Sequence, residues 1–301
     1  MGIAGFNEIK MLRNRHIVRY VVSLIMMGAL GCPVSLWAQS AHYINTAGTT
    51  LETRFTLPAG YERIPVGKNS YAYFLRRLRM LPYSATYNND LPENHQVSML
   101  NLPLMDNIEQ DIQFQDIHLC VRLRGEYLFS REQYDKIAFS IAVKRIFYIE
   151  WAKGLELVIN DKRHWTQQKY GIDRLGTFQN YLFFIFYHSN INTILLDTQP
   201  IPINDIMPGD MFIQAGFPGA AVMVLDVAAN SATGDRIFLL AGIYKSLQTV
   251  YVLVNPKEAW SGSPWYSIKA GKEKVVTPNF VFYKTDLRRF QERYTSTTAK
   301  R

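Results

Sequence analysis

The chain has 301 residues, a formal net charge of +8 and two cysteines. Its 18 Tyr and 17 Phe residues, with a charged fraction of 19%, favour a compact globular protein and exclude an intrinsically disordered one. The densest basic segment, Arg76–Arg79, is too short for a nucleic-acid-binding tail, so we predict no nucleic-acid partner. We interpret it as the solvated face of a short helix, with contact to a phosphate or an anionic polymer as the alternative.

Residues 1–38 have the pattern of a secretory signal peptide. Four basic residues between positions 10 and 19 precede the apolar stretch Val21–Leu30, which is too short to span a bilayer, and small residues follow near Ala38. Cleavage there would remove these four basic residues and one acidic residue, which lowers the net charge from +8 to +5. The alternatives are an uncleaved anchor and a lipoprotein, because residues 29–32 resemble a weak lipobox that would place a lipid on Cys32.

We therefore expect an exported protein of the periplasm or cell envelope, with membrane contact only if Cys32 carries a lipid. Cleavage near Ala38 would leave Cys120 as the sole cysteine, which excludes an intramolecular disulfide and a cysteine-based zinc site. The sequence also lacks a Gly-rich phosphate loop, a His-Glu-x-x-His motif and a Gly-x-Ser-x-Gly motif. We predict no bound metal and no cofactor.

The first part of the mature chain is predicted to have little regular structure. Residues 39–50 are small and polar, so we expect a flexible leader before a single α+β domain at residues 51–285. Asn69 and Ser70 indicate the start of a short helix that ends before Pro82.

Three longer helices are predicted over the middle of the chain. Apolar residues at helical spacing indicate the first over residues 108–127. The second is expected over residues 130–153, because this segment opens with a Ser-x-x-Gln capping box and Gly154 is a typical stop. Residues 177–188 predict a third helix, which is rich in aromatic residues.

From residue 205 onward the pattern changes to that of strands. Strands are predicted over residues 210–214, 221–228, 236–241 and 249–254, and residues 230–234 supply turn chemistry. The basic segment 286–301 is expected to be a C-terminal tail, either frayed or preceded by a short helix near Lys284. Helices followed by strands indicate an α+β fold with helices packed on an antiparallel sheet.

Asp116 is an anomaly on the first long helix. At about 100° per residue it lies near the middle of an apolar stripe that includes Ile112, Leu119 and Leu123. A carboxylate there is costly to bury unless it is paired or hydrogen-bonded. The residue either has a structural role, near the surface or capping a neighbouring strand, or faces a functional site.

Several short segments together resemble a known family. They are Gly60–Arg63, Ser70–Arg76, Arg122–Leu128, Gly209–Ile213, Phe217–Gly219, Phe238–Ala241 with Tyr244, Asn255-Pro256 and Pro264–Tyr266. Their order and spacing resemble the exported bacterial family called domain of unknown function 4846, over about residues 53–270. The resemblance implies a Cys on a helix, a His after the Pro-Gly turn and a Gln after the third strand. That order is similar to NlpC-type papain-like enzymes, in which a thiolate attacks a carbonyl and an imidazole transfers the proton.

The chain departs from this pattern at all three places. Asp116 stands at the Cys position, Ala220 at the His position and Gly242 at the Gln position. A carboxylate cannot act as a thiolate, and a methyl group cannot accept a proton. The resemblance therefore implies a papain-like arrangement without its catalytic residues, a pseudoenzyme that binds a peptide, a cell-envelope polymer or a protein partner. We also expect the Ala220 side chain to face Asp116.

Two alternatives remain. The first is an active cell-envelope hydrolase, an amidase or peptidase that uses Cys120 as a displaced nucleophile or pairs Asp116 with Asp210 or Asp226 as glycosidases do. The second is a structural subunit of an envelope complex. Each candidate also has a structural interpretation: Cys120 as a core residue, Asp210 as a turn residue and Asp226 as a solvent-exposed residue.

The binding hypothesis needs a groove beside the three degenerate positions. We place Cys120, Asp210, Tyr244, Gln248 and Trp265 in this candidate groove. The loop before Trp265 is interpreted as a turn that caps the core, with stacking on a sugar or a peptide as the alternative.

Overall fold

The computed structural model describes residues 43–83, 98–99, 115–154, 156–159, 162–165, 171–216, 219–244, 246–258, 262–269 and 272–292. The predicted signal peptide, including Ala38 and Cys32, lies outside the described residues. Within them, no helix combines the length and the hydrophobicity that crossing a bilayer requires.

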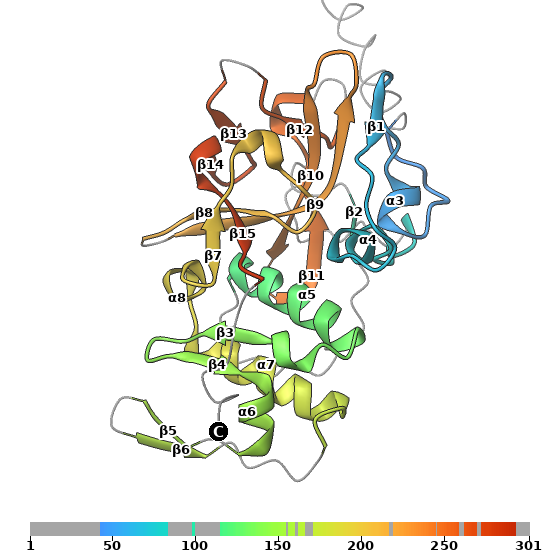
Figure 1. The fold of residues 1–301 in the computed structure, drawn as a ribbon. Coiled ribbons are helices and arrows are strands. Elements are labelled where there is room, and N and C mark those ends of the chain that lie inside the picture. The colour runs from blue at the N-terminus through green and yellow to red at the C-terminus, as the bar shows by residue number, and fades with distance from the viewer. Residues whose placement is uncertain are drawn as a thin grey trace, which may run out of the picture.

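The largest element is an antiparallel sheet with the strand order β2-β11-β10-β9-β8-β15-β7, to which β1 and β12 add at the side (Figure 1). Its strands are β1 Tyr61–Arg63, β2 Ser98–Met99, β7 Thr198–Pro200, β8 Met211–Gln214, β9 Ala220–Asn230, β10 Arg236–Tyr244, β11 Ser246–Val252, β12 Tyr266–Ser267 and β15 Leu287–Phe290. The four predicted strands correspond to β8, β9, β10 and β11. The mixed α+β fold with a mainly antiparallel sheet is confirmed.

The helices lie mostly on one side of this sheet (Figure 1). They are α3 Leu51–Arg54, α4 Tyr71–Arg76, α5 Asp116–Ser130, α6 Tyr148–Lys153, α7 Leu175–His188 and α8 Ile191–Leu195. Three hairpins complete the fold: β3 Ala138–Ser140 with β4 Arg145–Phe147, β5 Glu156–Ile159 with β6 Lys162–Trp165, and β13 Lys274–Val276 with β14 Val281–Tyr283. Short 3-10 turns are η3 Tyr134–Lys136, η4 Ile203–Asp205, η5 Pro256–Glu258 and η6 Lys284–Asp286.

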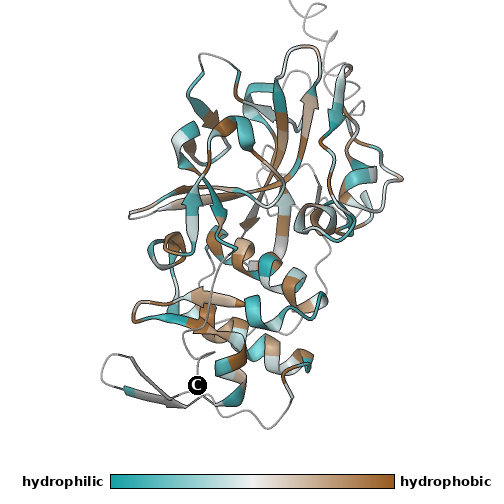
Figure 2. Ribbon diagram, viewed as in Figure 1, coloured by the Kyte–Doolittle hydropathy of each residue, from teal (hydrophilic) through white to brown (hydrophobic). Residues whose placement is uncertain are grey.

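The sheet is buried on both faces. Along β9, Ala221 and Met223 belong to an apolar cluster shared with α5 and α7, whereas Val222 and Val224 belong to a second cluster beneath β13 and β14. Side chains of a strand alternate between its faces, so a strand buried on both sides is an uninterrupted apolar run. Hydrophobic residues accordingly gather on β9, β10 and the facing helices (Figure 2).

The first long helix begins later than predicted. Gln115 is the N-cap with extended backbone angles, φ −110° and ψ 157°, so α5 starts at Asp116. Residues 108–114 of the predicted helix lie outside the described residues. The apolar spacing could not locate this start because residues 117–123 are all buried. With no exposed face over that stretch, the period of the pattern is weak.

The predicted helix over residues 130–153 is wrong. The Ser130 hydroxyl donates back to the Tyr127 carbonyl at 2.7 Å and ends α5 instead of capping a new helix. The apolar run after Ile137 forms the hairpin of β3 and β4, because a short apolar run fits a buried strand as well as a helix. Gly154 does end α6, with φ 96°, as predicted. The predicted aromatic helix is also present, as α7.

Both ends of the domain extend further than predicted. Ile44 is buried and pairs with Phe55, and Thr50 caps α3, so residues 43–50 pack against the domain and are no flexible leader. The tail predicted from residue 286 contains β15, which pairs with both β8 and β7. Two buried apolar residues, Leu287 and Phe290, hold this basic strand in the sheet.

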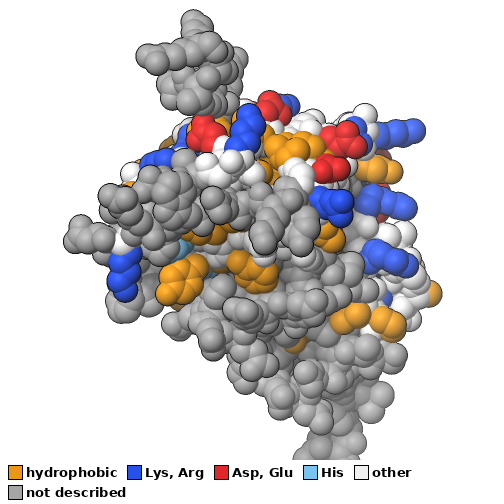
Figure 3. Space-filling model, turned by 90° about the horizontal axis from the view of Figure 1, so that it is seen from below, with side chains coloured by type: hydrophobic (Ala, Val, Ile, Leu, Met, Phe, Trp, Pro, Cys, Tyr) orange, Lys and Arg blue, Asp and Glu red, His pale blue; other side chains and the backbone are white. Residues whose placement is uncertain are grey.

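Seen from below, the described acidic and basic side chains are interspersed along one part of the surface, with scattered hydrophobic groups between them (Figure 3). Opposite charges are mixed on this face.

Candidate functional site

Asp116 lies where the sheet opens between β9 and β10. Its Oδ1 atom accepts a hydrogen bond from the Ile243 amide at 2.8 Å, and a Cβ atom added to Gly242 would lie 3.3 Å from the same oxygen. The pairing of β10 with β9 ends at Ala241 and Met223. The Leu240 carbonyl accepts from the amide of Leu253, the residue just after β11. Strand alternation therefore turns the Ile243 amide to the opposite side, toward β9, where the pairing has ended. The carboxyl of Asp116 supplies the missing acceptor.

The environment of Asp116 explains how a carboxyl group is tolerated there. Burial raises its pKa from 3.8 to about 6, and the hydrogen bond from the Ile243 amide acts in the opposite direction. Asp116 is the first residue of α5, so the unpaired amides of the helix N-terminus also favour a negative charge. Of the roles expected for Asp116, the structure shows the structural one: from the first residue of α5 it caps a neighbouring strand.

Cys120 lies one turn along α5. It is 0% exposed, and burial raises the pKa of its thiol far above the ordinary range. Its Sγ atom lies 3.8 Å from the Asp116 carbonyl oxygen, which a thiol can approach as a weak donor. His118 is also buried, with its ring centroid 5.3 Å from that of Phe186. Burial lowers the His118 pKa to about 4, so its imidazole is neutral at pH 7.

The structure places Ala220 at the start of β9, where it pairs with Gln214 of β8. Its side chain is buried in the second apolar cluster, whereas the apolar residues of α5 belong to the first. The structure brings Asp116 and Gly242 together. The expected orientation of the Ala220 side chain toward Asp116 stays a prediction. Tyr244 ends β10 and Gln248 lies within β11.

Asp226 is buried, which corrects its predicted exposure. It is 0% exposed and forms ion pairs with Arg63 at 2.6 Å and Arg76 at 2.7 Å. Arg76 is itself buried, so this member of the basic segment is no part of a solvated face. The alternating pattern failed because the pairing of β9 with β10 has a register irregularity between Leu239 and Leu240, and because both faces of β9 are covered.

Asp210 belongs to the turn before β8, as its structural interpretation predicted. Its Oδ2 atom accepts from the Met207 amide at 2.8 Å, and Arg289 of β15 donates to both carboxylate oxygens at 2.6 and 2.9 Å. Burial raises the pKa of Asp210, and the hydrogen bonds and charge of Arg289 oppose that effect. The carboxylate is fully engaged in holding the turn to β15.

Trp265 is a core residue. It is 3% exposed, and its Nε1 atom donates to the Thr56 carbonyl at 2.9 Å. The Arg63 guanidinium lies 5.9 Å from its ring centroid. These contacts favour the core-capping interpretation of the preceding loop.

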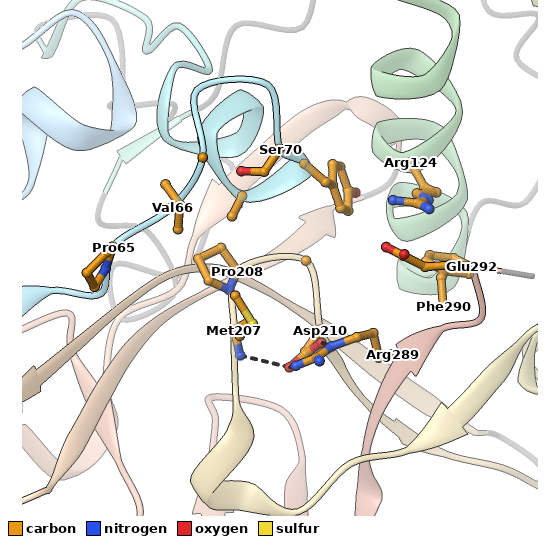
Figure 4. A pocket seen from close by; sticks show the side chains of 14 residues that line it. Pro65, Val66, Ser70, Arg124, Met207, Pro208, Asp210, Arg289, Phe290 and Glu292 are labelled. Carbon is orange, nitrogen blue, oxygen red and sulfur yellow. Dashed lines mark hydrogen bonds and ion pairs between the residues drawn. The ribbon is translucent and has the colours of Figure 1, made fainter. Parts of the chain in front are cut away.

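A cavity of about 260 Å³ lies beside α4 and α5, and Figure 4 shows its side chains. Residues before α4, the turn before β8 and the end of β15 complete its walls. The apolar lining comes from Pro65, Val66, Met207, Pro208 and Phe290, and the charged lining from Arg124, Asp210, Arg289 and Glu292. We call this space the Arg124 pocket.

Arg124 was not singled out from the sequence. Its guanidinium lies 5.2 Å from the Tyr71 ring centroid and 5.7 Å from that of Tyr127, and it forms no ion pair with a described residue. The only feature of the sequence that could have identified Arg124 was its helical spacing from Arg122 and Glu126. Arg122 and Glu126 are four residues apart and pair at 2.6 Å, which leaves the arginine between them on another face.

Among the described residues, no group of three His, Cys, Asp or Glu side chains is placed to hold a metal ion. A family described as domain of unknown function (4846) matches residues 51–289. No curated protein matches the chain. No solved structure matches it either.

Proposed function

We propose that this chain, which belongs to the family described as domain of unknown function 4846, is a non-catalytic binding protein of the cell envelope. One observation carries the proposal. Asp116, which stands where the NlpC-type resemblance expects a nucleophile, is half-buried and hydrogen-bonded to the Ile243 amide at 2.8 Å. A side chain that closes the sheet in this way is a structural group, and it cannot attack a carbonyl.

The alternative of a displaced cysteine nucleophile has little physical support. A thiol reacts as its thiolate, and burial raises the pKa of Cys120, so the thiolate is rare at pH 7. Its nearest histidine along the helix, His118, is packed against Phe186.

A carboxylate pair has little support as well. Asp210 is bound by Arg289 and Asp226 by two arginines, whereas a glycosidase needs one carboxyl group that is free to give a proton. Both carboxylates are explained by the arginines that they hold.

The Arg124 pocket is the best-supported place for a ligand. An arginine stacked on aromatic rings keeps its planar fork of N–H donors available, and a carboxylate is the group that this fork binds in two parallel hydrogen bonds. The apolar walls around it suit the side chain next to a terminal carboxylate. We therefore propose that the pocket binds the carboxyl end of a peptide, either free or part of a cell-envelope polymer.

Glu292 further restricts the chemistry of the ligand that the pocket can bind. It lines the same cavity as Arg124 and is exposed, and Figure 4 shows the two side chains at the same wall. A carboxylate alone would meet repulsion from Glu292, whereas a peptide whose last residue also carries an ammonium group on its side chain would satisfy both residues.

The location in the cell envelope rests on the sequence of residues 1–38, which is typical of an exported protein. A lipid on Cys32 would tether the domain to a membrane; cleavage near Ala38 would release it.

The proposal is tested with the full chain carrying Cys32→Ser, so that Cys120 is the only thiol. Peptides with a free carboxyl end are incubated with it, and their C-terminal amides serve as controls. We expect the free-acid peptides to raise the melting temperature, the amides to have no effect, and all peptides to be recovered intact. Iodoacetamide should leave Cys120 unmodified in the folded protein and modify it in urea.

Cleavage of any peptide, abolished by Cys120→Ser, would establish the hydrolase alternative instead. Equal stabilisation by the free-acid peptides and their amides would contradict the proposal that the pocket binds the terminal carboxylate.

A further inference from the structure

We propose that a second cavity, on the other face of the sheet, binds a phosphate group. This cavity of about 570 Å³ is larger than the Arg124 pocket and shares no lining residue with it. We call it the basic cavity, after its four cationic residues Arg236, Lys269, Lys272 and Lys284.

Elements far apart in the sequence bring these cations together. Arg236 begins β10, and the Lys284 amide donates to the Glu273 carbonyl at 2.9 Å, which fixes η6 beside the segment before β13. Lys269 and Lys272 are held together because the Lys272 amide donates to the Lys269 carbonyl at 3.0 Å. The cluster is thus set by the backbone of the fold.

The negative charges nearby are fewer. Asp235 is the acidic residue in the lining. Glu273 is not in the lining but forms an ion pair with the lining residue Lys284 at 2.5 Å. Lys284 and Glu273 are both exposed, so this ion pair is weak and open to exchange. Lys269 and Lys272 are exposed and form no ion pair with a described residue.

The donor set matches a phosphate better than a carboxylate. The Arg236 Nη1 atom donates to the Ile206 carbonyl at 2.9 Å, which holds the side chain in place. The other N–H groups of this guanidinium can then donate to an anion in the cavity. Lysine ammonium groups bind phosphate as point charges. A cavity with several cations suits a phosphate group because a phosphate carries more negative charge than a carboxylate. Phe238 and Ile268 add apolar surface, which suits an organic phosphate ester.

The test uses pyrophosphate as the probe, titrated by calorimetry into the full chain and into a Lys269→Gln/Lys272→Gln variant. A Lys144→Gln/Lys153→Gln variant removes the same charge from exposed positions outside the cavity and is the control. We expect one pyrophosphate per chain, with Kd at least tenfold weaker in the cavity variant and unchanged in the control. The affinity should also fall as salt is raised.

A vesicle arm identifies the source of the phosphate. Binding to vesicles of phosphatidylglycerol and phosphatidylcholine, lost in the cavity variant, would assign the site to a lipid headgroup; pyrophosphate binding without vesicle binding would assign it to a soluble phosphate. Either result supports the site. No pyrophosphate binding, or equal weakening in both variants, would overturn it, and neither outcome affects the proposal for the Arg124 pocket.

Discussion

At the scale of single residues, each carboxylate inside the fold is satisfied by a hydrogen bond or an ion pair to another segment. Asp116 accepts from a strand amide, Asp210 from Arg289, and Asp226 from Arg63 and Arg76. Asp197 follows the same rule, since it accepts from the Ser140 amide at 2.7 Å and pairs with Arg145. Each carboxylate joins segments distant in the sequence, which is why sequence alone could not separate these residues from catalytic ones.

The replacement Asp116→Asn should change how stability depends on pH. Because the Asp116 pKa is higher in the folded protein, about 6, than its ordinary 3.8, the folded state binds more protons between these values. Stability therefore falls as pH rises through this window, by on the order of 2–3 kcal/mol from this group. Asn keeps an oxygen acceptor for the Ile243 amide and does not titrate.

We expect Asp116→Asn to match the wild type near pH 4 and to be more stable at pH 7, by urea denaturation at each pH. Asp116→Ala, which removes the acceptor, should be less stable at both. If Asp116→Asn loses more stability at pH 7 than at pH 4, the anion itself is stabilising and our assignment is wrong.

Asp226→Asn should be among the most destabilising replacements. Removing one partner of a buried ion pair leaves the other charge unpaired, and here two arginines would lose their partner, so we expect a loss of about 3 kcal/mol or more. Glu62→Gln, at an exposed site on the neighbouring strand β1, is the control and should change stability by less than about 0.5 kcal/mol. Equal urea midpoints for the two variants would contradict a structural role for Asp226.

At the scale of elements, burial on every side decides what the sequence can reveal. The strands β8 to β11 were predictable, because β-rich segments alternate with turns such as the one closed by Asn230 and Gly234. The start of α5 and the β3–β4 hairpin were not, because a fully buried apolar run carries no period to distinguish its faces. β15 was missed because its two arginines reach partners that only the tertiary structure supplies.

The contact between α5 and α7 depends on a glycine. A Cβ atom added to Gly125 would lie 3.2 Å from the Phe178 ring and 3.3 Å from Leu182, so Gly125→Ala must displace these two side chains of α7. We expect a loss of about 1 kcal/mol, because overpacking outweighs the gain in helix propensity. Gly176→Ala on α7 meets no atom within 4 Å and should instead stabilise by a few tenths of a kcal/mol. Thermal unfolding of the two variants checks this prediction. Stabilisation by Gly125→Ala would show that Phe178 and Leu182 make room for the methyl group, so that the helix contact does not depend on the glycine.

At the scale of the whole molecule, the sheet separates two cavities with different chemistry. The Arg124 pocket combines apolar walls with one arginine and one exposed glutamate, whereas the basic cavity gathers four cations. The sequence was sufficient to select Asp116 and Gly242, which lie together, because a family resemblance marked both positions. It could not select Arg124, whose importance depends on the two rings beneath it and on walls from three other segments.

The most direct test of the central claim is the binding of a peptide with a free carboxyl end, measured by calorimetry with the peptide analysed afterwards by mass spectrometry. Arg124→Met removes the guanidinium, and Arg131→Met, an exposed arginine just after the same helix, is the matched control. A charge-assisted hydrogen bond contributes about 1.5–3 kcal/mol, so we predict binding at least tenfold weaker for Arg124→Met, unchanged for Arg131→Met, and an intact peptide throughout. A cleaved peptide, or equal affinity for the two variants, would contradict the account.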